Sequence, residues 1–253
     1  MTRMSRISRP LVLARVLVGP RRSQGSDHLL ALFLAVVAGA SNAGGFFALA
    51  QYTSHMTGYL SQVADNLVVG NFLVLVTALL AIVSFMSGAA VSAFLVNWAS
   101  HRRNGKHFAL PLAVEGTCLA CFAFGGVFTT EAGRIFALAW LCCIMGMQNA
   151  TITKISGARI RTTHATGMIT DIGIESGRAV YGLLWPESRV KADRGKLRIL
   201  LSLVGAYVLG GVVGATGYLL LSFCFALPLA ALLLALSLPS LLTRPRRFWR
   251  SLM

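Results

Sequence analysis

The chain has 253 residues, of which 56% are hydrophobic and only 12% are charged, and its mean hydropathy is +0.71. A soluble domain of this length cannot hide so much apolar surface from water, so the composition excludes an ordinary soluble protein and indicates a bilayer environment. The formal net charge of +15 would suggest nucleic acid in a soluble protein, but the placement of the charges favours membrane topology, and we expect no nucleic-acid partner.

The first 27 residues form a basic segment. Its six arginines surround a short apolar run that Arg15 interrupts, so the segment lacks the continuous apolar core of a signal peptide. We expect an uncleaved cytoplasmic tail, with an amphipathic helix on the membrane surface as the alternative.

Six apolar stretches follow, each long enough to cross the hydrocarbon core, which takes about 20 helical residues. They lie at 29–50, 72–99, 108–128, 134–153, 197–217 and 219–242. The predicted fold class is therefore an all-α membrane protein of about six transmembrane helices.

The basic residues fix the expected orientation. With the N-terminus inside, the cytoplasmic segments are 1–28, 100–107, 154–196 and 243–253, and counted through Arg198 they hold 22 of the 23 Lys and Arg residues. Only Arg134 lies elsewhere. The positive-inside rule thus predicts both termini in the cytoplasm, where the same charges attract anionic lipid headgroups.

The chain also contains an internal repeat. Segment 52–61 (YTSHMTGYLS) reappears as 161–170 (RTTHATGMIT), and 39–43 (GASNA) lines up with 146–150 (GMQNA) before it. Six identical residues, FALPLA, begin at Phe108 and again at Phe225. The order of these features predicts two halves of three spans each.

We place the first half at 28–130 and the second at 131–242, with basic tails at 1–27 and 243–253. A repeat of three spans must insert its second copy upside down. The charges agree with this: segment 51–71 has no Lys or Arg, whereas 154–196 has eight. One motif is therefore expected to open outward and the other inward.

After each motif histidine comes a moderately apolar stretch that begins and ends on one side of the membrane, as a re-entrant or interfacial helix does. Its Thr-Gly pair supplies a hydroxyl and a flexible backbone position, which suit a broken helix end. The histidines themselves have a structural role, carry protons or contact a solute. The candidate substrate-binding or gating residues are Ser54, His55, Thr57, Gly58, Thr163, His164, Thr166, Gly167, Asp171, Glu175, Asn42, Asn149 and Glu115.

Polar residues recur on one face of each motif helix. Asp171, Glu175 and Arg178 follow His164 at spacings that share a helical face, as Gln62 and Asn66 follow His55. The alternative is an amphipathic interfacial helix on which Glu175 and Arg178 form an ordinary surface pair. Glu115 lies inside an apolar span, where a carboxylate costs on the order of 3 kcal/mol, so we expect it to face a partner or a cavity, with proton coupling as one use.

No pattern points to an enzyme, a metal or a cofactor. All five cysteines lie within predicted spans, and the Cys118-x-x-Cys121 pair is expected to pack as small apolar residues. Hydrolase, phosphate-loop and haem signatures are missing from the sequence. Small residues such as Gly88 and Gly210 in the second span of each half predict close helix packing.

In segments 38–43 (AGASNA), 54–58 (SHMTG), 146–150 (GMQNA) and 161–167 (RTTHATG), the chain resembles the YoaK family of bacterial multi-pass membrane proteins. The resemblance covers roughly residues 28–242 and departs from the family pattern at Tyr59, where relatives have asparagine. It implies a bacterial cytoplasmic membrane location and about six spans, without an established activity.

These observations favour a small secondary transporter or solute-binding membrane protein of undefined substrate and coupling ion. The alternative is a non-transporting membrane component that binds a protein partner or anionic lipid through its basic cytoplasmic face. An intramembrane enzyme is a third hypothesis with less support. A chain this small often pairs to build a pathway, so a homodimer is also expected.

Overall fold

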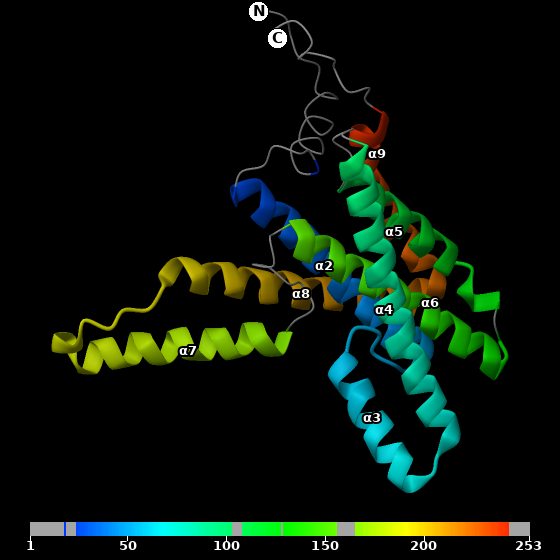
Figure 1. Ribbon diagram of the computed structural model, residues 1–253, viewed down its shortest axis with the longest axis horizontal. Coiled ribbons are helices and arrows are strands. Elements are labelled where there is room, and N and C mark those ends of the chain that lie inside the picture. Colours follow the sequence, from blue (N-terminus) through cyan, green and yellow to red (C-terminus); the bar gives the residue numbers. More distant parts are fainter. Residues whose placement is uncertain (1–17, 19–23, 103–107, 128, 156–164, 243–253) are drawn as a thin grey trace, which may run out of the picture.

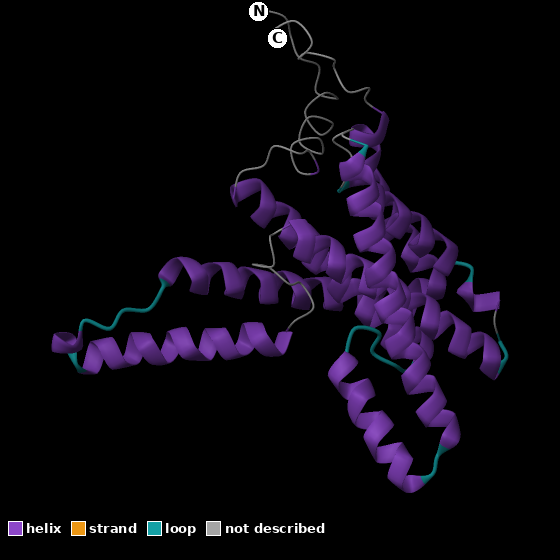
Figure 2. Cartoon of the chain, in the orientation of Figure 1, coloured by secondary structure: helices purple, strands orange, loops and turns teal. Residues whose placement is uncertain are grey.

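The computed structural model describes residue 18 and residues 24–102, 108–127, 129–155 and 165–242. This part of the chain is helical and contains no strand, which confirms the all-α fold class (Figures 1 and 2). The α-helices are α2 (Gln24–Leu49), α3 (Met56–Val69), α4 (Phe72–His101), α5 (Ala109–Phe122), α6 (Glu131–Ile155), α7 (Ala165–Leu184), α8 (Arg194–Leu221) and α9 (Ala226–Leu242). Short 3-10 turns are η1 (Gly125–Val127), η2 (Pro186–Ser188) and η3 (Ser222–Phe225).

Five segments of the described chain are long and apolar enough to cross a membrane. They are Gly25–Leu49, Phe72–His101, Ala109–Val127, Glu131–Lys154 and Arg194–Leu242. The last holds two helices, α8 and α9, because Ser222 takes a positive φ of 50° and the chain bends there. The predicted boundary near residue 218 is therefore wrong, since α8 continues to Leu221.

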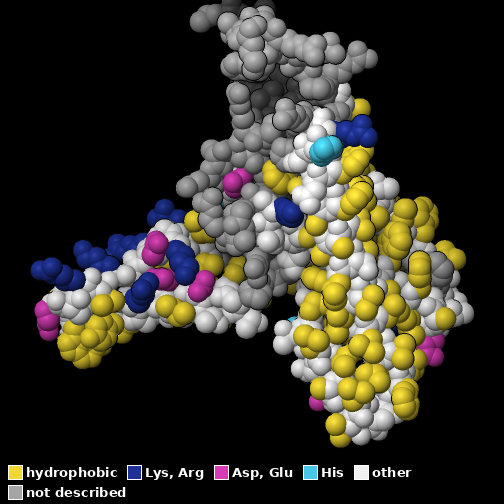
Figure 3. Space-filling view, viewed as in Figure 1, with side chains coloured by type: hydrophobic (Ala, Val, Ile, Leu, Met, Phe, Trp, Pro, Cys, Tyr) yellow, Lys and Arg dark blue, Asp and Glu magenta, His cyan; other side chains and the backbone are white. Residues whose placement is uncertain are grey.

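The outer surface is apolar where a soluble protein would be polar. On α4, the side chains of Phe72, Val76 and Phe94 are 75%, 59% and 67% exposed. Figure 3 shows such side chains spread over the α3–α4 side of the molecule. Lipid is the solvent that covers this surface without penalty, so the apolar helices are those of a membrane protein.

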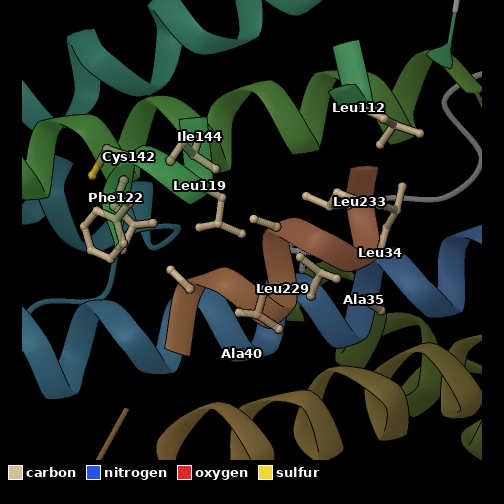
Figure 4. Close-up of a cluster of buried hydrophobic side chains, with 14 of the residues drawn as sticks. Leu34, Ala35, Ala40, Leu112, Leu119, Phe122, Cys142, Ile144, Leu229 and Leu233 are labelled. Carbon is tan, nitrogen blue, oxygen red and sulfur yellow. The ribbon is translucent and has the colours of Figure 1, made fainter. Parts of the chain in front are cut away.

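The long helices pack in pairs that join distant parts of the chain: α2 against α8, α4 against α6, and α5 against α9. Leucines and small residues fill the space between α2, α5 and α9, among them Leu34, Leu112 and Leu233, which are fully buried (Figure 4). This core holds the bundle together.

Glycines allow α2 and α8 to come into backbone contact. A Cβ atom on Gly39 would overlap the carbonyl oxygen of Tyr207, and one on Gly210 would overlap that of Val36. Gly214 is pressed in the same way against Ala40. The small residues of α8 therefore serve close packing, as expected from their spacing.

The same arrangement recurs between α4 and α6. A Cβ atom on Gly146 would overlap the carbonyl oxygen of Phe85, and one on Gly88 would overlap that of Cys143. Nearby, the hydroxyls of Ser92 and Thr151 lie 2.8 Å apart in a hydrogen bond across the two helices. Small and hydroxylated side chains are thus the contact residues of this pair as well.

The helices that follow the motifs form hairpins with their successors. Helix α3 begins directly after His55 and packs on α4, and α7 begins at Ala165 and packs on α8. Gly70, with a φ of 76°, ends α3 before Asn71 caps α4. Both hairpins project from the bundle, while the first turns of α3 and α7 lie near its centre (Figure 1). A helix after each motif is therefore confirmed.

Candidate functional site

A cavity of about 970 Å³ lies where the two repeated motifs meet. Its walls come from α2, α3, α4, α6, α7 and α8. The lining residues are Asn42, Tyr52, Ser54, His55, Met56, Thr57, Phe85, Ala89, Asn149, Ala150, Thr153, Lys154, Ala165, Thr166, Gly167 and Tyr207. Residues more than 100 positions apart in the sequence thus share one space.

In the first motif, Asn42 holds the chain between α2 and α3. Its Oδ1 accepts hydrogen bonds from the backbone amides of Thr53 and Ser54, each at 3.1 Å, and from the Ser54 hydroxyl at 3.0 Å. Thr53 is fully buried beside this contact. One side-chain oxygen therefore fixes the break that lets a new helix begin at the cavity.

His55 and Thr57 stand at the start of α3 and are exposed to the cavity. The His55 side chain makes no capping hydrogen bond to the helix. Its ring covers the first turn, where a Cβ atom on Gly58 would overlap the imidazole. A larger residue at this position would displace the His55 ring. Tyr59, the departure from the resembling sequences, is buried.

In the second motif, Asn149, Thr166 and Gly167 line the cavity. Among described residues, the Oδ1 of Asn149 has no hydrogen-bond partner, in contrast to that of Asn42. Thr166 and Gly167 lie in the first turn of α7, as Thr57 and Gly58 lie in that of α3. The predicted residues Thr163 and His164 lie outside the described residues.

The lining residues outside the repeated segments include Phe85, Tyr207 and Lys154. The first two precede the packing glycines Gly88 and Gly210 by three positions, so an aromatic-x-x-Gly spacing was the available signal. Lys154 ends α6, and its Nζ lies 3.5 Å from the Oδ1 of Asn97. The sequence alone predicted Lys154 only as one of the basic residues of the cytoplasmic segment 154–196.

Asp171 and Glu175 do not line the cavity; they join α7 to α8. The buried Glu175 accepts a hydrogen bond from the backbone amide of Asp193 at 2.9 Å and lies 3.2 Å from Arg178 and 3.8 Å from Lys196. Lys196 also pairs with Asp171 at 3.4 Å. The expected pair of Glu175 and Arg178 is present, but Glu175 is a buried bridge between helices rather than a surface group.

Glu115 is also away from the cavity. It is 1% exposed on α5, a helix that packs mainly on α9. Its neighbour Gly116 approaches Ala230 and Leu233, and the Oε2 of Glu115 has no hydrogen-bond partner among described residues. The structure therefore does not join Glu115 to the two motifs, and the partner or cavity expected for it is not found in the described chain.

No group of three metal-ligating side chains gathers within the described residues. The five cysteines are free, with Cys118 and Cys121 among the side chains of α5. The cavity is therefore lined by amide, hydroxyl, imidazole, ammonium and aromatic groups. Such groups can bind and orient a polar solute by hydrogen bonds and charge.

The apolar spanning helices, and the cavity between them that polar side chains of both motifs line in part, define a helical, multi-span membrane protein. The family model described as "Protein of unknown function (DUF1275)" matches residues 30–238, so the chain belongs to that family. The match agrees with the resemblance to YoaK-like proteins and covers the same part of the chain. Comparisons with curated proteins and with solved structures found no match.

Proposed function

We propose that this protein is a small secondary transporter of the bacterial cytoplasmic membrane, which binds a polar solute in the central cavity. The observation that carries the proposal is the pairing of equivalent residues around that cavity. Asn42 and Thr57 come from one half, and Asn149 and Thr166 come from the other. A solute site at the interface of two repeats is the usual arrangement in such transporters.

The helix contacts support a two-fold relation between the halves. In one half-to-half contact, Gly39 meets Tyr207; in the other, Gly146 meets Phe85. Residues 39 and 146 correspond in the repeat, and an exchange of the halves converts one contact into the other. With α2, α4, α5, α6, α8 and α9 as six crossings, a two-fold axis in the membrane plane relates the halves, and α3 and α7 are re-entrant helices.

This arrangement gives the two hairpins the role of gates. The α3–α4 hairpin opens toward the outside and the α7–α8 hairpin toward the cytoplasm, and each begins at the cavity. Movement of one hairpin at a time would expose the same site to one side and then to the other. The proposed process requires no covalent step.

The test is the accessibility of the cavity from each side. Single cysteines are placed at Thr57 and Thr166 in a background without the five native cysteines, and a membrane-impermeant maleimide is applied to intact cells and to inverted vesicles. Alternating access predicts that both positions react from both sides. Thr216→Cys is the matched control, because Thr216 is exposed on the outer face of α8 and should be covered by lipid.

If each cysteine reacts from one side of the membrane only, the result would contradict transport. It would favour the second candidate, a membrane component that binds a protein partner or anionic lipid through its basic cytoplasmic face. One observation favours that alternative: Tyr181 and Trp185 stack with ring centroids 5.0 Å apart beside a cleft of about 630 Å³ that Arg178, Lys191 and Arg194 line. Exposed aromatic and cationic side chains suit the membrane interface.

A further inference from the structure

The charged groups around the central cavity are of one sign. Lys154 is the one permanently charged side chain among the described lining residues, which include no aspartate or glutamate. We propose that the solute of this cavity is a small anion. The inference rests on the proposed function, because it names the chemical class of the solute that the cavity binds.

The nearest acidic side chains do not offset this charge. Asp171 and Glu175 lie further along α7 and are paired with Lys196 and Arg178. Lys154 contacts the neutral amide of Asn97 and forms no ion pair within the described chain. Lys154 is exposed at the end of a spanning segment, and one unneutralised cation in the lining favours a solute of opposite charge.

The directions of helices α3 and α7 also favour an anion in the cavity. Helices α3 and α7, of 14 and 20 residues, both begin at the cavity, where Thr57, Thr166 and Gly167 line it. The amides of a first helical turn have no acceptor within the helix, and the N-terminal end carries a partial positive charge. Two such ends in one cavity add to the charge of Lys154 and supply hydrogen-bond donors to an anion.

Other solutes fit this lining less well. A cation would meet the charge of Lys154 and find no carboxylate among the described lining residues to bind it. A neutral solute would make no charge-assisted contact with the Lys154 ammonium. The volume of about 970 Å³ accommodates a hydrated inorganic anion or a small organic one.

The experiment measures protection of a cysteine at the cavity. Thr166→Cys, in the background without native cysteines, is purified in detergent and treated with maleimide in a zwitterionic buffer of low salt. Acetate, phosphate and sulfate are added as sodium salts, choline as its buffer salt, and glycerol as a neutral solute. We expect at least one of the three anions to slow the reaction, while choline and glycerol leave it unchanged.

The matched variants are Lys154→Gln and Lys191→Gln. Loss of a charge-assisted contact at Lys154 should weaken the protection roughly tenfold, whereas Lys191, on the turn before α8 and outside the cavity, should have no effect. A cysteine at the exposed Asn71 controls for general salt effects on the reagent. Both lysines are exposed, so neither change threatens folding.

Protection by choline or glycerol, protection that survives Lys154→Gln, or protection by none of the solutes would each overturn the anion proposal. The two-sided labelling of the same cysteine decides separately whether the cavity alternates between the two sides. A cavity that alternates but excludes the anions would retain the transporter and reject its solute class.

Discussion

Single glycines set the distance between the helices that surround the cavity. Gly39, Gly88, Gly146 and Gly210 each lie against a backbone carbonyl of the opposing helix, so no other residue fits there without a shift of the backbone. Gly205, on the same helix as Gly210, has open space where its side chain would be. The helix packing therefore distinguishes glycines that are sterically required from one that is not.

We predict that Gly39→Ala lowers the thermal stability of the purified protein, because overpacking of this kind costs about 1–3 kcal/mol. Gly205→Ala is the matched control and should leave the melting temperature unchanged or raise it, since alanine favours a helix by up to about 1 kcal/mol over glycine. Both variants would be compared by thermal unfolding in the same detergent. Equal effects of the two substitutions would refute the assigned contact between α2 and α8.

The repeat identified part of the site because it places the same side chains at the same local positions. Asn42, Thr57, Asn149 and Thr166 line the cavity as their motifs suggested. Helical periodicity also grouped Asp171 with Glu175, but it could not tell which helix that face would meet. The sequence therefore predicted the shared face and missed its partner, α8.

Tyr207, Phe85 and Lys154 could not be predicted as lining residues for the same reason. Each lies in a span whose neighbours are brought together only by the packing of distant helices. Glu115 shows the converse: the cost of a carboxylate in a span suggested a functional position, yet the side chain is buried on α5 and does not line the cavity. Local patterns indicate the face of a helix but not what lies opposite.

At the scale of elements, the α7–α8 hairpin is held by one buried carboxylate. Glu175 bonds to the Asp193 amide, and Asp193 in turn caps α8 by accepting from the backbone amide of Lys196 at 2.9 Å. The cap of one helix is thus tied to the middle of the other. The hairpin should move as one unit as long as Glu175 is in place.

Glu175→Ala is therefore expected to loosen the hairpin. It leaves the Asp193 amide without its acceptor and Arg178 without its carboxylate, while Lys196 keeps its pair with Asp171, a loss of about 1–3 kcal/mol. Hydrogen exchange in α7 should become about tenfold faster or more. Glu187→Ala is the control, because Glu187 is exposed on η2, and unchanged exchange in both variants would contradict the bridging role.

Apolar length predicted most helix positions well. The predicted stretch 72–99 corresponds to α4, and 134–153 lies within α6. The boundary between α8 and α9 was misplaced because residues 218–227 are almost uniformly apolar. The bend falls at Ser222, a positive φ without the glycine or asparagine that usually signals one.

At the scale of the molecule, the two hairpins extend in different directions from a common centre (Figure 1). The turn of the α3–α4 hairpin lies in a segment without Lys or Arg, whereas the α7–α8 hairpin carries Arg178, Arg189, Lys191, Arg194 and Lys196. Charge asymmetry of this size sets the side on which a segment stays. Opposite sides for the two turns are therefore expected if the halves are inverted.

The decisive prediction concerns these turns rather than the cavity. Single cysteines at Asn71 and Arg189 lie at the exposed ends of the two hairpins, far along the chain from the motifs. An impermeant maleimide should label Asn71→Cys only in intact cells and Arg189→Cys only in inverted vesicles, because neither turn needs to move for transport. Labelling of both from the same side would mean that the halves are parallel. The matching glycine contacts of α2–α8 and α4–α6 would then reflect a two-fold axis along the membrane normal, and alternating access through an inverted repeat would be rejected even if the cavity binds a solute.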